Sequence, residues 1–288
     1  MLVDLVQTAT RDGVRLDGMV LQPPSSGADS PLDAVVCVHG TGGNFYGSTL
    51  FDALGERLLG RGIGVLRVNT RGHDLMCNVA TTKGGGRRLG AAYEVLDECR
   101  HDLATWVGWL KERGARRIGL VGHSSGAVKC LYAQAHEPDE AVAAVLALSP
   151  PRLSHAWFAA SDRRLEFLNT YQQAQGLIAA GEPGALLDVR LPLPFVITAA
   201  GYVEKYGPDE RYNYLKFIDK VAVPTLLTLG ELEAANNIAF RGAAEAVGQA
   251  APRMRVETIA GADHFYTGVR AALLAVVDHW LDRLPSTA

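Results

Sequence analysis

The chain has 288 residues, of which 48% are hydrophobic and 20% are charged, a composition typical of a globular protein with a sizeable core. A formal net charge of −3, without a long basic run, argues against nucleic acid or an anionic membrane as the main partner. The sequence shows neither a leader-like N-terminus nor an apolar run of membrane-spanning length, so we expect a cytoplasmic protein.

Apolar stretches of strand length alternate with helical patterns along most of the chain. An opening hairpin is predicted over residues 2–8 and 14–21. The later alternation predicts a parallel sheet covered on both faces, with strands at 34–38, 63–68, 117–121, 141–148, 223–229 and 253–259. The glycine-rich stretch 83–88 is interpreted as a flexible, solvated loop, with binding of a substrate carboxylate or phosphate by its three cations as the alternative. The alternation of strand and helix patterns stops between about residues 151 and 219, which indicates a cap inserted between core segments 1–150 and 220–288.

The most informative motif is Gly-x-Ser-x-Gly at residues 122–126. A strand pattern precedes it and a helical pattern follows, which is the context that a nucleophile elbow requires. Glycine at both ends lets the backbone turn sharply. Ser124 is therefore the predicted nucleophile, and His123 is expected to turn away from the face that presents Ser124.

A serine hydroxyl is a weak nucleophile and needs a base that is itself oriented by an acid. In the chain order serine, acid, histidine, the loop before the last helix supplies His264 as the base. The acid is expected just after the strand at 225–229, where Glu233 is the first choice and Glu231 the alternative. Asp263 is interpreted as a residue that shapes its loop.

An acyl-transfer intermediate also needs backbone N–H donors for its oxyanion. The residue after the nucleophile, Ser125, is expected to supply one. The other should come from the loop at 39–44, where the glycine spacing allows close backbone approach. Thr41 is the first choice for this donor and Gly42 the second. This loop lacks the sequence of a phosphate-binding loop, and the eight histidines and four cysteines show no metal-ligand spacing, so we expect no cofactor and no metal.

Taken in order along the chain, these motifs resemble those of the α/β-hydrolase superfamily. The residues that carry the resemblance are His39-Gly40, Arg71-Gly72-His73, the Gly122–Gly126 elbow, the acid loop after Gly230, and Asp263-His264. The resemblance covers about residues 2–284 and implies an eight-stranded, mostly parallel sheet flanked by helices, with a helical cap and a Ser124-Glu233-His264 triad. Glutamate stands where aspartate is commoner, and Asp74 where many relatives have glycine.

The predicted function is that of a serine hydrolase of the carboxylic ester hydrolase class, which cleaves a small or medium ester through an acyl-enzyme. Alternatives are a hydrolase or acyltransferase acting on a lactone, thioester, amide or carbon–carbon bond, and a ligand-binding member of the fold without catalysis. The expected partner is a small ester-like molecule. Phe45, Tyr46, Trp157 and Tyr171 are predicted to contact it, and the oligomeric state is not predicted.

Overall fold

A computed structural model describes residues 3–24 and 30–285 of the chain. Its centre is an eight-stranded sheet with the order β1-β2-β4-β3-β7-β8-β11-β12. The first two pairings, β1 with β2 and β2 with β4, are antiparallel, and the other five are parallel. The predicted mostly parallel sheet is therefore confirmed, although the expected start of the first strand at Leu2 lies outside the described residues.

The strands of the sheet match the predicted apolar runs to within a few residues. Their bounds are β1 (Asp4–Ala9), β2 (Arg15–Leu21), β3 (Ala34–Val38), β4 (Gly64–Val68), β7 (Ile118–His123), β8 (Val142–Leu148), β11 (Thr225–Gly230) and β12 (Arg255–Ile259). Every residue of β3, β4, β7 and β11 is buried. Continuous apolar runs of this kind are typical of parallel strands that are covered on both faces.

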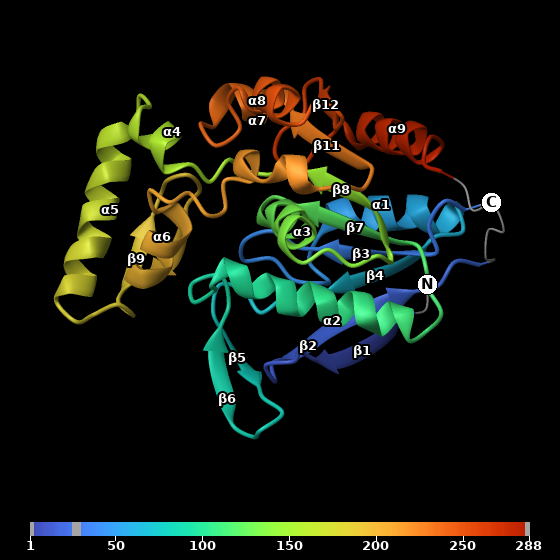
Figure 1. Cartoon of the computed structure of the whole chain (residues 1–288), viewed down its shortest axis with the longest axis horizontal. Helices are drawn as coiled ribbons and strands as arrows, with labels where there is room; N and C mark the ends of the chain where they lie inside the picture. Colours follow the sequence, from blue (N-terminus) through green and yellow to red (C-terminus); the bar gives the residue numbers. More distant parts are fainter. Residues whose placement is uncertain (1–2, 25–29, 286–288) are drawn as a thin grey trace.

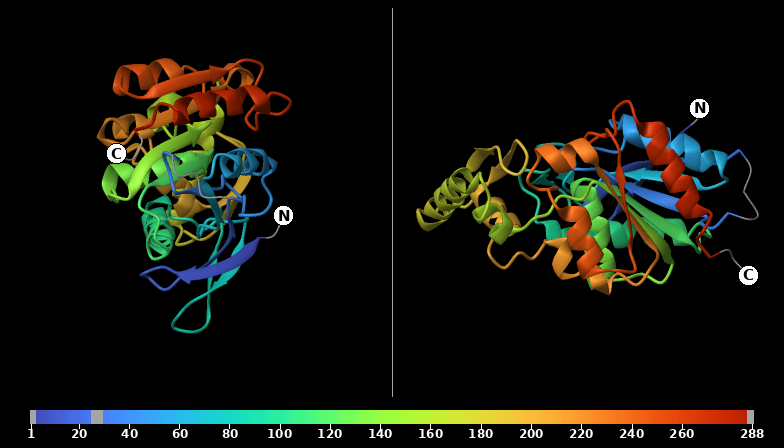
Figure 2. Two further views of the ribbon diagram at one scale, coloured as in Figure 1. Left: turned by 90° about the vertical axis from the view of Figure 1, so that its right-hand side faces the viewer. Right: turned by 90° about the horizontal axis from the view of Figure 1, so that it is seen from above.

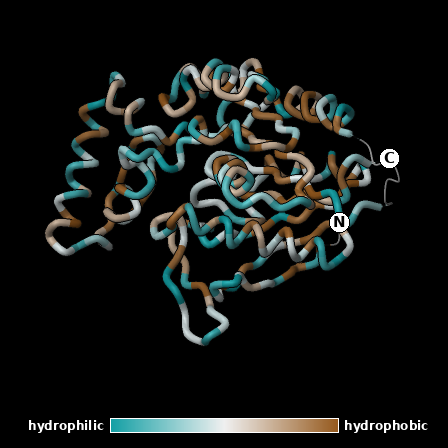
Figure 3. The backbone as a smooth tube through the Cα atoms, viewed as in Figure 1, coloured by the Kyte–Doolittle hydropathy of each residue, from teal (hydrophilic) through white to brown (hydrophobic). Residues whose placement is uncertain are grey.

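Helices cover the two faces of the sheet and create two separate apolar cores (Figure 1). One core lies between the sheet and the helices α1 (Thr49–Gly60) and α9 (Arg270–Leu281). The larger core lies under α2 (Cys99–Lys111), α3 (Ser125–His136) and α8 (Ala243–Ala250). Figure 3 shows the hydrophobic stretches gathered toward the centre of the molecule. Within the described ranges, no helix combines the length and apolar character needed to cross a bilayer.

The segment between β8 and β11 forms most of a separate layer at one end of the sheet (Figures 1 and 2). It contains α4 (His155–Ala159), α5 (Arg164–Ala179), β9 (Leu186–Val189), β10 (Phe195–Thr198), α6 (Ala199–Tyr206) and short 3-10 turns at 214–216 and 218–220. β9 and β10 pair antiparallel, so the segment is not purely helical as expected. The cap limits of 151 and 219 stay a prediction.

A second hairpin occupies the stretch that was expected to be a flexible loop. β5 (Cys77–Ala80) pairs antiparallel with β6 (Gly86–Leu89), and the hairpin projects from the body in Figure 1. Gly84 and Gly85 both adopt positive φ, a conformation that glycine reaches without steric cost and that a tight turn between strands requires. The glycine run therefore closes a hairpin, and the loop interpretation was wrong for residues 86–88.

Candidate active site

The nucleophile elbow is crowded at both of its glycines. A Cβ at Gly122 would lie 2.3 Å from the Gly126 carbonyl oxygen, and one at Gly126 would lie 2.2 Å from the Val38 carbonyl oxygen. No side chain fits at such distances. Ser124 lies between β7 and α3 with φ 57° and ψ −126°, a strained conformation that a serine holds only where its surroundings impose it.

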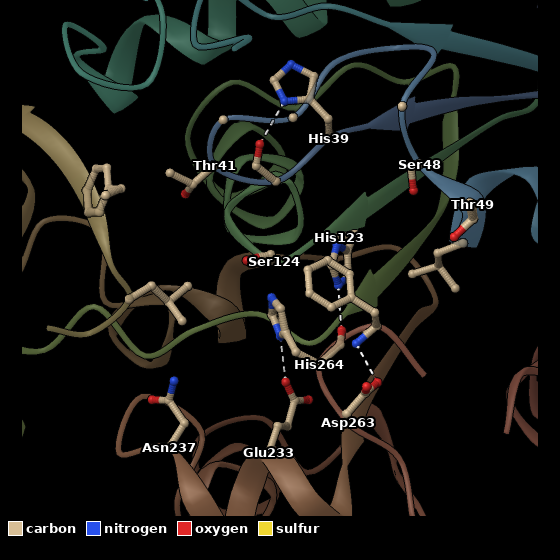
Figure 4. Close-up of a pocket in the computed structure, with 18 of the residues that line it drawn as sticks. His39, Thr41, Ser48, Thr49, His123, Ser124, Glu233, Asn237, Asp263 and His264 are labelled. Carbon is tan, nitrogen blue, oxygen red and sulfur yellow. Dashed lines mark hydrogen bonds and ion pairs between the residues drawn. The ribbon is translucent and has the colours of Figure 1, made fainter. Parts of the chain in front are cut away.

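Ser124, His264 and Glu233 line one cavity. Each follows the carboxyl end of a different strand: Ser124 in the turn after β7, Glu233 in the first turn of α7 (Glu231–Asn236) after β11, and His264 in the loop after β12. The Nδ1 atom of His264 lies 2.6 Å from Glu233 Oε2. Figure 4 shows the His264 ring between Ser124 and the carboxylate. No direct hydrogen bond joins Ser124 to His264 between these described side chains, a looseness common in free enzymes, where catalytic contacts tighten when the substrate binds.

Neutral groups hold the carboxylate of Glu233. Its Oε1 atom accepts a hydrogen bond of 2.7 Å from the Gly230 backbone N–H and one of 2.5 Å from the Ser149 hydroxyl. Ser149 Oγ is also 2.8 Å from the Tyr266 hydroxyl, which is 2.7 Å from Thr228 Oγ1. Burial raises the pKa of Tyr266 well above its usual range, so this phenol stays protonated. The sequence analysis did not single out Ser149, Tyr266 or Thr228.

The alternative acid, Glu231, points elsewhere. It is exposed, and its Oε2 atom accepts a hydrogen bond of 2.8 Å from the Gly261 backbone N–H. Glu233 is 6% exposed and faces the histidine. Asp263 accepts bonds from the backbone N–H groups of Phe265 and Thr267, which is the loop-shaping contact expected of it.

His123 lines the cavity instead of turning away from it, so that expectation was wrong. Its Nε2 atom lies 2.8 Å from the backbone oxygen of His264, and the two rings are 4.7 Å apart between centroids. Burial, followed by the charge of His264, lowers the pKa of His123 to about 3. The neutral ring therefore connects the elbow to the loop that carries His264.

The loop after β3 lies against the elbow. A Cβ at Gly40 would be 3.0 Å from Ser124 Cβ, so glycine permits this approach. The Thr41 hydroxyl donates to the Ser125 hydroxyl over 3.1 Å, which brings the two predicted oxyanion donors together. Ser125 begins α3, so its N–H has no carbonyl partner within the helix. Thr41 and Gly42 both line the cavity.

The cavity has a volume of about 1000 Å³. Beyond Ser124, His264 and Glu233, its walls come from the first turn of α1, from the stretch 193–195, from α7 and the residues just after it, and from the loop after β12. Figure 4 shows Thr41 and Asn237 on one side of Ser124, and Ser48 and Thr49 on the other. The space therefore extends to both sides of the serine, as a substrate with groups on both sides of a scissile bond requires.

The four residues predicted to contact the substrate are not among the described residues that line this cavity. Tyr46 is 65% exposed, next to Phe45. Trp157 donates its indole N–H to the Ile238 backbone oxygen over 2.8 Å. Tyr171 is buried, with its ring 4.9 Å from that of His155. Trp157 and Tyr171 thus pack within the protein, and Phe195 and Phe240 line the cavity instead.

The strand order and the elbow define an α/β-hydrolase architecture, and comparison with known proteins agrees. The model of the alpha/beta hydrolase family matches residues 35–277, and the chain belongs to this family. A search of curated proteins finds no match.

Among solved structures, the chain is similar to the alpha/beta hydrolase GrgF from Penicillium sp. sh18, with 18% identity, 99% of each chain covered and a TM-score of 0.68. It is also similar to Est1E from Butyrivibrio proteoclasticus, solved with ferulic acid bound, with 18% identity, coverage of 97% and 98%, and a TM-score of 0.67. The Pyrococcus furiosus esterase Pf2001 matches with 18% identity, coverage of 98% and 91%, and a TM-score of 0.62. At this identity the likeness shows the shared fold.

Proposed function

We propose that the protein is a serine hydrolase that cleaves a small or medium carboxylic ester through an acyl-enzyme. The observation that carries the proposal is the convergence of Ser124, His264 and Glu233 on one cavity, with a 2.6 Å contact between histidine and acid. Membership of the alpha/beta hydrolase family and the esterases among its structural neighbours support it.

In the proposed reaction, Glu233 accepts a hydrogen bond from the Nδ1–H group of His264, which leaves Nε2 with a free lone pair. His264 then removes the proton of the Ser124 hydroxyl as Oγ attacks the ester carbonyl carbon. The oxyanion accepts hydrogen bonds from the backbone N–H groups of Ser125 and Thr41. These two donors are preorganised, because their side chains are already joined to each other.

The tetrahedral intermediate collapses when the bond from the carbonyl carbon to the alcohol oxygen breaks. His264 gives its proton to that oxygen, and the alcohol leaves. A water molecule, deprotonated by His264, then attacks the acyl-enzyme, and the proton returns to Ser124 as the acid product departs. Throughout these steps the negative charge of Glu233 stabilises the imidazolium form of His264.

The test is hydrolysis of p-nitrophenyl esters from acetate to decanoate by the native protein and by Ser124→Ala. We expect turnover in the native protein and a loss of about 10³-fold or more in the variant. The matched control is Ser161→Ala, which changes a serine that does not line the cavity and should keep native turnover. Equal turnover by native protein and Ser124→Ala would refute the proposal.

A fluorophosphonate probe separates the alternatives. Labelling of Ser124 without turnover of any ester would indicate a different acyl chemistry, such as cleavage of a lactone, thioester or amide. A folded native protein that neither turns over esters nor reacts with the probe would instead favour a ligand-binding role.

A further inference from the structure

Three buried charged side chains lie together behind the oxyanion loop. Lys129 on α3, Glu94 before α2 and Lys205 on α6 are each no more than 3% exposed. Lys129 Nζ is 2.5 Å from Glu94 Oε1, and Lys205 Nζ is 3.6 Å from Glu94 Oε2. A buried charge is costly unless it is paired, and none of these groups takes part in the proposed reaction.

Glycine in the Arg71-Gly72-His73 motif makes room for this cluster. A Cβ at Gly72 would lie 2.1 Å from Glu94 Oε1, which is far inside van der Waals contact. The carboxylate therefore occupies the space that a side chain at position 72 would take. This explains in physical terms a glycine that the sequence analysis only matched to a family pattern.

Lys129 is linked to the oxyanion loop through two further side chains. Its Nζ donates to the Thr70 hydroxyl over 3.0 Å. The Thr70 backbone N–H donates to His39 Nε2 over 3.1 Å, and the Thr70 hydroxyl lies 3.2 Å from the same nitrogen. His39 Nδ1 in turn donates to the Gly40 backbone oxygen over 2.8 Å. The contacts run without a break from the helix behind the nucleophile to the residue before Thr41.

This chain of contacts works only if His39 is neutral, because Nε2 must accept hydrogen bonds while Nδ1 donates one. His39 is 2% exposed. Burial and then the charge of Lys129 lower its pKa to about 3. The lysine therefore supports the arrangement in two ways, as a donor to Thr70 and as a charge that opposes protonation of the histidine.

We propose that Lys129 is a positioning residue for the oxyanion loop: with its charge balanced by Glu94, it fixes Thr70 and His39 and thereby the backbone donor at Thr41. This assignment rests on the proposed hydrolase function, since it concerns the donors to the reaction's oxyanion. Misplacing such a donor weakens the binding of the transition state more than the binding of the substrate.

The cluster offers a matched pair of variants. Lys129→Met and Lys205→Met each leave one lysine facing Glu94, so both keep one neutral ion pair. Only Lys129→Met removes the donor to Thr70. With p-nitrophenyl butyrate we expect kcat to fall about 10-fold or more in Lys129→Met while KM stays within about twofold of the native value. In Lys205→Met we expect kcat within about twofold of native.

Two further measurements separate positioning from general loss of stability. Thr70→Val removes the hydroxyl in the middle of the series of contacts from Lys129 to Gly40. In the double variant with Lys129→Met the loss of kcat should be no larger than the greater single loss, because both substitutions interrupt the same series of contacts. A trifluoromethyl ketone forms an adduct with the serine whose oxygen lies in the oxyanion hole. Its inhibition constant should rise in Lys129→Met by the factor by which kcat/KM falls.

Native kcat and native inhibition in Lys129→Met, measured well below its unfolding temperature, would overturn the assignment. An equal loss of kcat in Lys205→Met would overturn it too, because the effect would then follow the ion cluster and not the contact to Thr70. If the native protein itself shows no Ser124-dependent turnover, the proposed function falls, and this assignment with it. The native and Ser124→Ala reactions, run alongside, distinguish these cases.

Discussion

Glu233 and Glu94 are buried almost equally, at 6% and 3% exposure, in opposite surroundings. Glu233 accepts hydrogen bonds from a hydroxyl, a backbone N–H and an imidazole. Glu94 lies between the ammonium groups of Lys129 and Lys205. Burial alone would raise the pKa of Glu94, but the two lysine charges outweigh burial and lower its pKa to about 2.

The comparison teaches that the neighbours of a buried carboxylate decide what it is able to do. Hydroxyl and N–H donors hold Glu233 in place without cancelling its charge, so the charge remains available to a histidine that becomes positive during a reaction. The charge of Glu94 is already balanced by lysine, so this residue anchors its neighbours. The charge of Glu233 is able to stabilise a positive histidine, whereas the charge of Glu94 holds its two lysine neighbours in place.

The largest expected effect comes from removing the negative charge of Glu233. Glu233→Gln keeps the shape of the side chain, but its amide neither carries a charge nor favours the required tautomer of His264. We expect kcat to fall by about 10³- to 10⁴-fold, measured by hydrolysis of a p-nitrophenyl ester. Glu231→Gln is the control and should keep native kcat. The reverse result would move the role of acid to Glu231.

The carboxylate of Glu94, whose charge the lysines balance, should matter for the stability of the fold. Glu94→Gln leaves two buried lysines without a counter-charge, and we expect the free energy of unfolding to fall by about 3–5 kcal/mol. Chemical denaturation at neutral pH measures it. The control is Glu166→Gln, which breaks the exposed pair with Arg163 and should cost less than about 1 kcal/mol. Similar losses in both variants would contradict the contrast between the two glutamates.

The neutral donors around Glu233 should have an intermediate effect. Ser149→Ala removes one hydrogen bond to the carboxylate, and such bonds to charged groups contribute about 1.5–3 kcal/mol. We expect kcat to fall about 10- to 100-fold with KM nearly unchanged, measured with the same ester. Tyr266→Phe acts one bond further away and should lose less. Because both act through Glu233, neither should lower kcat further in a Glu233→Gln background.

The smallest expected effect concerns pH. The pKa of His39 is about 3 in the folded chain and about 6.5 when unfolded. Between these values only the unfolded chain binds the proton, so stability falls as pH drops, by about 1.4 kcal/mol per pH unit per histidine. His39→Gln should make the free energy of unfolding less dependent on pH between about pH 4 and pH 6, inside the interval in which only the unfolded chain binds the proton. Denaturant unfolding at several pH values measures this slope. His279→Gln, at an exposed histidine, should leave the slope unchanged.

Several features were predictable because their causes are local in the sequence. The elbow is one, because the Gly-x-Ser-x-Gly motif and the strand and helix patterns that flank it lie within one short stretch of sequence. The parallel strands are another, because burial on both faces requires continuous apolar runs. The sequence limits the predicted acid to Glu231 or Glu233, and only the direction in which each side chain leaves its helix distinguishes the two.

Other features depend on contacts between distant parts of the chain. Ser149 and Tyr266 are 117 positions apart, and nothing around either residue in the sequence marks it as a neighbour of the acid. The sequence around the glycine run at residues 84–86 predicted a loop, because the strands on both sides are short and mostly exposed and so lack an apolar pattern. Tyr171 shows a third reason: an aromatic residue suits a ligand pocket and a core equally well, and here it packs on His155.

The wall of the cavity at Leu193, Pro194 and Phe195 has a different origin from the reacting groups. It belongs to the insertion between β8 and β11, whereas the serine, acid and histidine follow strands of the central sheet. We therefore expect substitutions in this short stretch to reshape the cavity beside Ser124 while the contact between His264 and Glu233 stays in place. A variant library confined to residues 193–195 is the economical starting point for changing which molecules the cavity accepts.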